Sequence, residues 1–122
     1  MATNVGATGD RIVYANSGSA ISAGDIVVVD GVIYVALVDI AATTGTGVIA
    51  TNCEVTAPKV SAAVIAAGET LVWDVSAGAF DDNAATPATG DVSGAAARAI
   101  EAGVDAQTTL RVKLTGVQGT VA

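Results

Sequence analysis

The chain has 122 residues, a length that predicts one domain able to fold alone. Its apolar content consists largely of 26 alanines and 19 valines, with only four aromatic residues, so we expect a core of thin layers. The net charge is −7 with five Lys and Arg, which argues against nucleic acid as a direct partner, because phosphate binding needs clustered basic side chains. No apolar run approaches the roughly 20 residues of a membrane span, and no signal peptide is evident, so we expect a soluble protein made in a cytoplasm.

The first nine residues are small, polar and glycine-containing, and they show no periodicity. They predict an extended arm at residues 1–9, followed by a single β domain at residues 10–122. A segment of this composition buries too little apolar surface to order itself, so we expect the arm to be mobile in the free protein and ordered on a partner. A frayed terminus is the alternative. Residues 11–15 then predict a short strand.

The strongest local signal is the dipeptide Asp30-Gly31, which separates Val- and Ile-rich runs at residues 26–29 and 32–38. Asp-Gly between such runs predicts an antiparallel hairpin, because a type I′ turn requires positive φ at both central residues. Neither run alternates between apolar and polar residues, so both faces of the hairpin need a cover. The domain's own core supplies one cover. The other is either a second layer of the same chain or a neighbouring subunit.

The following segments show weaker patterns. Residues 48–59 predict one strand that weakens toward its end, and residues 69–74 predict another. Residues 81–94, with Pro, Gly and polar turn-forming residues, predict an exposed loop. Residues 95–102 are helical by propensity but lie among strands. The tail beyond residue 116 carries little signal.

Residues 109–115 show the clearest amphipathic alternation of the chain. Their Leu and Val side chains are predicted to point inward, and Arg111 and Lys113 to share the outer face. This pair is either an ordinary solvated face or a small basic strip that meets an acidic partner surface.

The chain contains an internal echo, because residues 21–30 resemble residues 65–74. Each segment reads Ile-x-Ala-Gly-acid, then three mostly apolar positions, one large apolar residue and Asp. Each Gly predicts a turn that begins a strand. Two copies are too few for a solenoid, so they predict two similar strand-turn units within one small barrel or sandwich.

Motifs for catalysis or metal binding are not evident. No glycine pair is followed by the Gly-Lys-Ser/Thr of a phosphate-binding loop, and the lack of His removes the usual triads and zinc sites. Cys53 stands alone and is predicted to be a small buried apolar residue. Asp81 and Asp82 lack the spacing of a calcium loop and are predicted to cap turns. We therefore expect no enzyme, no cofactor and no metal.

Several runs, taken in order, resemble the small phage capsid cement proteins, which decorate the heads of tailed phages. These runs are Met1-Ala-Thr-Asn4, Gly24-Asp-Ile-Val-Val-Val, Val35-Ala-Leu-Val-Asp-Ile-Ala, a strand ending in Ala57-Pro-Lys59, residues 65–74, Phe80, residues 94–102 and Leu110-Arg-Val-Lys-Leu114. The similarity covers nearly the whole chain. One departure is the segment that starts at Asn52, where the family usually carries a Gly followed by bulkier apolar residues. Some family members carry a recombinase label, which the missing P-loop and the acidic charge do not support.

The resemblance implies an all-β fold, a small barrel or sandwich, in which residues 95–102 form a strand. It implies a structural virion protein that binds the outer surface of the assembled major capsid protein shell, often as a homotrimer, and stabilises the shell by bridging capsomers. Neither nucleic acid nor a membrane is an expected partner. The alternatives are a recombinase-like protein that handles DNA or nucleotides, for which a P-loop or basic groove would be the sign, and a carbohydrate-binding β module, which would show exposed aromatic residues. The candidate capsid or subunit contacts are Ala2, Thr3, Asn4, Val5, Arg111 and Lys113.

Overall fold

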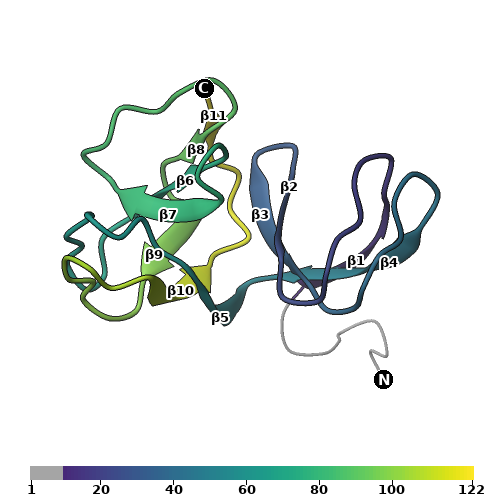
Figure 1. The fold of residues 1–122 in the computed structure, drawn as a ribbon, viewed down its shortest axis with the longest axis horizontal. Coiled ribbons are helices and arrows are strands. Elements are labelled where there is room, and N and C mark those ends of the chain that lie inside the picture. The colour runs from purple at the N-terminus through teal and green to yellow at the C-terminus, as the bar shows by residue number, and fades with distance from the viewer. Residues whose placement is uncertain (1–9) are drawn as a thin grey trace.

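The computed structural model describes residues 10–122, and the predicted arm at residues 1–9 lies outside this range. All regular structure in the described range is β (Figure 1). The strands are β1 (Asp10–Ala15), β2 (Ile26–Val29), β3 (Val32–Ala36), β4 (Thr46–Thr51), β5 (Cys53–Pro58), β6 (Leu71–Asp74), β7 (Ala79–Asp82), β8 (Val92–Ser93), β9 (Ala97–Ala99), β10 (Thr109–Leu114) and β11 (Thr120–Val121). The all-β prediction is confirmed, and β9 confirms a strand within residues 95–102.

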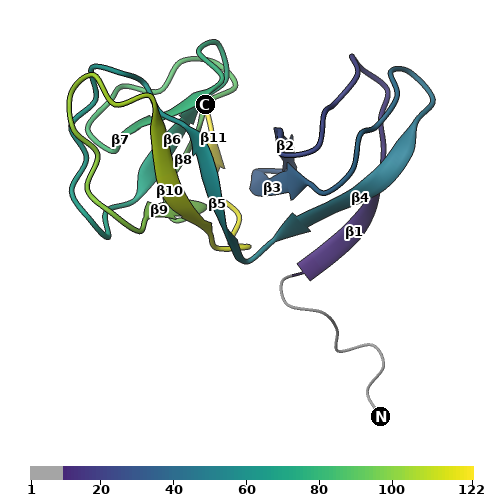
Figure 2. The ribbon, with the colours of Figure 1, turned by 60° about the horizontal axis from the view of Figure 1, so that its bottom comes forward.

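The strands form three antiparallel sheets that are arranged in two lobes (Figures 1 and 2). The first lobe, residues 10–51, is one sheet in the order β1-β4-β3-β2. The second lobe, residues 53–122, contains a sheet in the order β5-β10-β9 and a sheet in the order β11-β8-β6-β7. None of these sheets closes into a barrel. Of the two predicted forms, barrel and sandwich, the structure is therefore consistent with the sandwich.

The predicted hairpin is present as β2 and β3. Asp30 and Gly31 have φ angles of 52° and 81°, the positive values that the predicted turn requires, and Val29 lies opposite Val32. The hairpin is not central within its sheet, because β2 is an edge strand. It lies instead between two hydrophobic clusters.

Both faces of this hairpin are covered within the chain. On one face, Ile33 and Val35 belong to the main core, which they share with residues of the second lobe. On the other face, Val27 belongs to a smaller cluster with Ile40 and Ile49, all from the first lobe. The second cover is therefore the chain itself and not a neighbouring subunit, so the hairpin gives no reason to expect self-association.

The single strand predicted at residues 48–59 is wrong, because the structure has two strands there. Asn52 separates β4 from β5 with a φ of 54°, a left-handed conformation that Asn tolerates better than most residues. The chain leaves the first sheet at this residue and enters the second lobe (Figure 2). The Gly that the resembling family usually carries at this position is the signal for such a break, because Gly adopts positive φ readily.

The internal echo is confirmed as a structural repeat. We call residues 21–25 with residues 36–40 the first turn unit, and residues 65–69 with residues 99–103 the second turn unit. In the first unit, Ile21 and Ile40 exchange two backbone hydrogen bonds of 2.9 and 2.8 Å. In the second, Ile65 and Gly103 exchange two of 2.8 Å.

The glycine turns of the two units also make the same contacts. The N–H of Gly24 donates to the carbonyl of Ala36 at 2.8 Å, and the N–H of Gly68 donates to that of Ala99 at 2.8 Å. Each alanine donates in return to the acidic residue after the glycine, at 2.8 Å in the first unit and 2.9 Å in the second. Both glycines have positive φ, 93° and 86°. Each lobe thus contains one copy of the same turn.

The segment at residues 81–94 is more ordered than the predicted loop. It contains the end of β7 and all of β8, and β8 pairs with β11 from the tail. Asp91 is buried beside β8, where its carboxylate accepts hydrogen bonds from the N–H groups of Val75 at 3.0 Å and Ala88 at 2.9 Å. The buried carboxylate therefore joins this segment to the turn that follows β6.

The C-terminal tail also connects the second lobe to the first. The side-chain amide of Gln118 donates to the carbonyl of Asp30 at 2.7 Å, and the N–H of Gly119 donates to the carbonyl of Gly31 at 2.8 Å. Because β11 follows immediately and pairs with β8, the tail fastens the turn of the hairpin to the second lobe.

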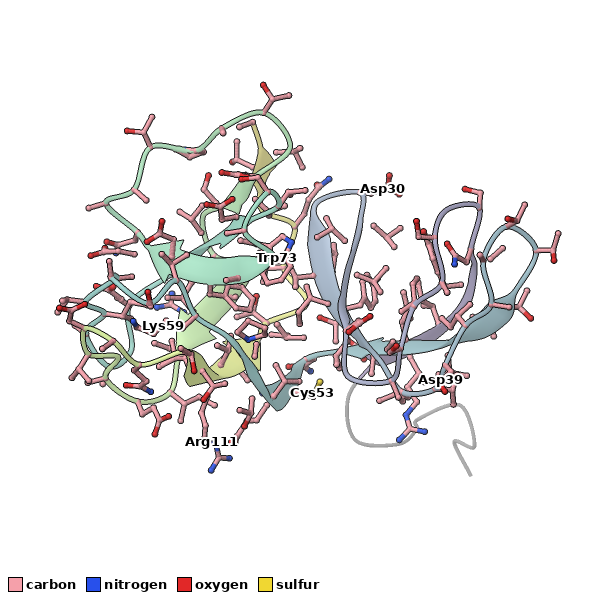
Figure 3. The ribbon with its side chains drawn as sticks, viewed as in Figure 1. Asp30, Asp39, Cys53, Lys59, Trp73 and Arg111 are labelled. Atoms are coloured by element: carbon pink, nitrogen blue, oxygen red, sulfur yellow. The ribbon has the colours of Figure 1, made fainter. Side chains whose placement is uncertain are left out.

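Lys59 is a buried cation at the base of two loops in the second lobe (Figure 3). Its side chain is 4% exposed, and its Nζ donates to the carbonyls of Val60 at 2.8 Å, Ser61 at 3.1 Å and Gln107 at 3.2 Å. Its stem fills the space beside Gly103, where an added Cβ would lie 2.9 Å from Cε. Lys59 thus ties the loop after β5 to the loop before β10.

Candidate functional site

The candidate site is the outer face of the β5-β10-β9 sheet. Along β10 the apolar residues are buried, while Arg111 is exposed and Lys113 is half-buried on the opposite face. The structure therefore brings the two predicted basic residues together on one strand face, as the alternation indicated.

A third basic residue, Arg98 of β9, lies on the same face, directly opposite Lys113. It was missed in the sequence because residues 95–102 were ambiguous, yet the pattern Ala-Arg-Ala in a strand places Arg outward between two inward alanines. Three of the five basic residues of the chain thus lie on one three-stranded sheet. Because the net charge is −7, this clustering is a local exception to an acidic surface.

The charges on this face are only partly paired. Arg111 Nη2 lies 2.9 Å from Glu54 Oε1, and both side chains are more than half exposed, so the pair contributes at most about 1 kcal/mol. Neither Arg98 nor Lys113 makes an ion pair with any residue in the range 10–122. Arg98 donates one hydrogen bond, to the carbonyl of Gly68 at 3.2 Å. Two cationic groups on this face therefore remain available to a partner.

Beside this face, a hollow of about 570 Å³ lies where the first lobe meets β5. Leu37, Cys53 and Val55 contribute to its lining, and Arg11 and Glu54 are its charged members. Burial raises the pKa of the Cys53 thiol, and the smaller effect of nearby Lys113 lowers it, so the thiol is protonated and poorly nucleophilic at neutral pH. The hollow offers apolar contact and no recognisable catalytic group.

The four aromatic residues all lie in the described range, and none of them is exposed. Trp73 and Phe80 are buried and pack edge to face with ring centroids 4.8 Å apart, while Tyr14 and Tyr34 are half-buried against the smaller cluster. A carbohydrate-binding module needs exposed rings to stack on sugars, and this part of the chain presents none.

Residues 10–122 present neither a metal-binding cluster nor a membrane-spanning helix. No three His, Cys, Asp or Glu side chains in this range are grouped so that they could hold a metal ion. No helix in the range is long and apolar enough to cross a membrane. The remaining candidate contacts, Ala2, Thr3, Asn4 and Val5, fall outside the described residues.

A family model described as phage cement protein matches residues 6–114, which is most of the chain. A search of curated proteins found no match.

Proposed function

The chain belongs to the phage cement protein family, and from this premise we propose that it binds the outer surface of the major capsid protein shell and bridges neighbouring capsomers. Members of this family are structural proteins associated with phage capsids, so the chain is a structural component of the virion. The binding partner, the side of the shell and the mode of stabilisation are the parts that we propose. We further propose that the chain acts without catalysis, and that it binds as a homotrimer.

The proposed mechanism is thermodynamic linkage. A protein that binds only the assembled shell stabilises that shell, by about 2.7 kcal/mol per site when the free protein is at a hundredfold excess over its dissociation constant. A shell offers many such sites, so modest binding at each one sums to a large effect. No covalent step and no cofactor is needed.

The observation that carries this proposal is the basic outer face of the β5-β10-β9 sheet. Arg98, Arg111 and Lys113 gather there in an otherwise acidic chain. A small cationic face on a rigid sheet fits a partner surface that carries carboxylates, and such complementarity sets orientation and association rate more than raw affinity. We propose that Ala2 and the three residues after it add a second contact with the shell or with a neighbouring copy.

The experiment is co-sedimentation of the purified protein with phage heads. We expect the protein to sediment with expanded, DNA-filled heads and to stay in solution with unexpanded ones. Lys113→Glu should weaken binding roughly tenfold at low salt, and by less at high salt, because exposed charges are screened. The double variant Asn83→Asp with Thr86→Glu is the matched control, since it makes the same change of net charge at two exposed positions of the loop between β7 and β8. Equal binding of the protein to both kinds of head would contradict the proposal, and equal effects of the two variants would remove the basic face from it.

A further inference from the structure

The repeated turn units carry a feature that folding does not require. In each unit, the alanine that pairs with the glycine turn is followed directly by an exposed aliphatic residue: Leu37 in the first unit and Ile100 in the second. Their exposed fractions are nearly identical, 41% and 40%. A side chain exposed to this extent in both copies contributes little to the core, so the repetition points to a contact outside the chain.

Each of these side chains sits within a small apolar patch. Ala23 beside Leu37 and Ala67 beside Ile100 are equivalent exposed residues of the two units, whereas the residue that follows the aliphatic one is Val38 in the first unit and Glu101 in the second. The backbone under each patch is held by the matched hydrogen bonds of its turn unit, so both patches are rigid before any partner arrives. Little conformational entropy would be lost on binding, which favours affinity.

The patches lie on different lobes, and each borders the basic face. Ala23 and Leu37 line the hollow beside that face together with Glu54 of β5. Ile100 is next to Arg111, because its N–H donates to the Arg111 carbonyl at 3.0 Å. The basic face therefore adjoins the second patch, and the first patch lies across the junction of the lobes.

We propose that the two turn units are two equivalent contact points, which bind the same feature on two neighbouring copies of the protein that forms the shell. The proposal rests on the proposed function, and it identifies the surface by which one cement molecule spans two subunits. A shell is a repetition of one protein surface, and a chain that presents the same exposed pair on each lobe, Ala23 with Leu37 and Ala67 with Ile100, is matched to a partner that repeats. The apolar patches would supply contact area, and Arg98 and Lys113 would supply orientation.

Two linked contacts make the expected effect large. Once one patch is bound, the other meets its target at a high effective concentration, which raises overall affinity by roughly a hundredfold or more over either contact alone. Loss of either patch should therefore remove nearly all of this gain, and the two losses should be similar.

The test compares Leu37→Asp and Ile100→Asp, each of which places a charge in one patch at an already exposed position. The matched controls are Ile12→Asp, on the opposite face of the first lobe's sheet from Leu37, and Val75→Asp in the second lobe, at residues that are 39% and 50% exposed. Binding to expanded heads is measured by co-sedimentation across a concentration series. The thermal disruption of the decorated heads is measured at saturating protein.

We expect Leu37→Asp and Ile100→Asp each to weaken binding by roughly a hundredfold relative to their controls. At saturation, heads coated with either variant should come apart at nearly the temperature of bare heads, because a molecule held by one contact no longer joins two subunits. The inference is overturned if only one variant differs from its control, if neither does, or if the variants at saturation still protect the heads. If the unmodified protein itself does not bind expanded heads, the proposed function fails instead.

Discussion

The buried ammonium of Lys59 leads to a specific prediction about stability. Replacing Lys59 by Met keeps an unbranched apolar stem beside Gly103 but removes the charge and three hydrogen bonds. Two of the three carbonyls retain another donor, since Val60 O also accepts from Ala63 N at 3.0 Å and Ser61 O from Ala106 N at 2.7 Å. The carbonyl of Gln107 loses the bond that Lys59 supplies.

The magnitude follows from these contacts. A shielded acceptor left without a donor costs about 1–3 kcal/mol, and each of the two weakened carbonyls adds up to about 1 kcal/mol. Relief from burying an ammonium group without a carboxylate offsets part of this loss. We expect Lys59→Met to lower the free energy of unfolding by about 2 kcal/mol. For a domain of this length, that corresponds to a fall in Tm of roughly 8 °C.

Thermal unfolding followed by circular dichroism, together with urea unfolding, measures this change. Lys113→Met is the control, because it removes the same group from an outer face and should change stability by less than about 0.5 kcal/mol. If Lys59→Met is as stable as the unmodified protein or more stable, the cost of burying the ammonium exceeds its value as a tie between loops, and the reasoning is refuted.

Three further predictions concern a backbone break, a turn and the arm. Asn52→Ala should lower the free energy of unfolding by about 1 kcal/mol, because Ala adopts positive φ at greater cost than Asn. Asn52→Gly should leave the free energy of unfolding unchanged. Equal urea midpoints for the two variants would contradict this prediction. The hydrogen bonds that Asp74 accepts from the N–H of Ala77 and the hydroxyl of Ser76 lower its pKa below the ordinary value of 3.8. The ionised Asp74 carboxylate therefore stabilises the fold at pH values above 3.8, and this stabilisation is lost as the pH falls through the lower folded-state pKa. The difference in Tm between Asp74→Asn and the unmodified protein should vanish in strong acid. Deletion of residues 2–8 should weaken binding to heads while leaving the Tm of the domain nearly unchanged, and undiminished binding would reduce the arm to a frayed terminus.

Local patterns in the sequence predicted the parts of the fold that local physics decides. The Asp30-Gly31 turn follows from the φ preferences of two adjacent residues, and β10 follows from strict alternation over six positions. β8 and β11 were not predictable in this way. Each has only two residues, and each exists because the tail returns to pair Thr120 with Ser93, a contact that no local pattern encodes.

The candidate site was predictable to the same extent. Arg111 and Lys113 were placed on one face because they are two residues apart in a clear strand. Arg98 depends on a segment whose alanines favour helix, and its position beside Lys113 exists only once that segment pairs as β9. The burial of Lys59 could not be predicted. A single Lys in a sequence looks the same whether its side chain is solvated or enclosed by three carbonyls. The break at Asn52 was visible only through the Gly that the resembling family prefers there.

The tail that reaches the hairpin turn has a mechanical consequence. The chain passes from the first lobe to the second at Asn52, beside Cys53, on the lower side of the junction in Figure 3, while Gln118 and Gly119 hold the Asp30-Gly31 turn on the upper side. A junction attached at one edge can swing open like a hinge, but one attached at two opposite edges resists opening. A load applied between the lobes is therefore shared between the covalent connection, the tail and the common core. A link of this kind transmits force with little extension, and the proposed bridging of neighbouring capsomers would require that property.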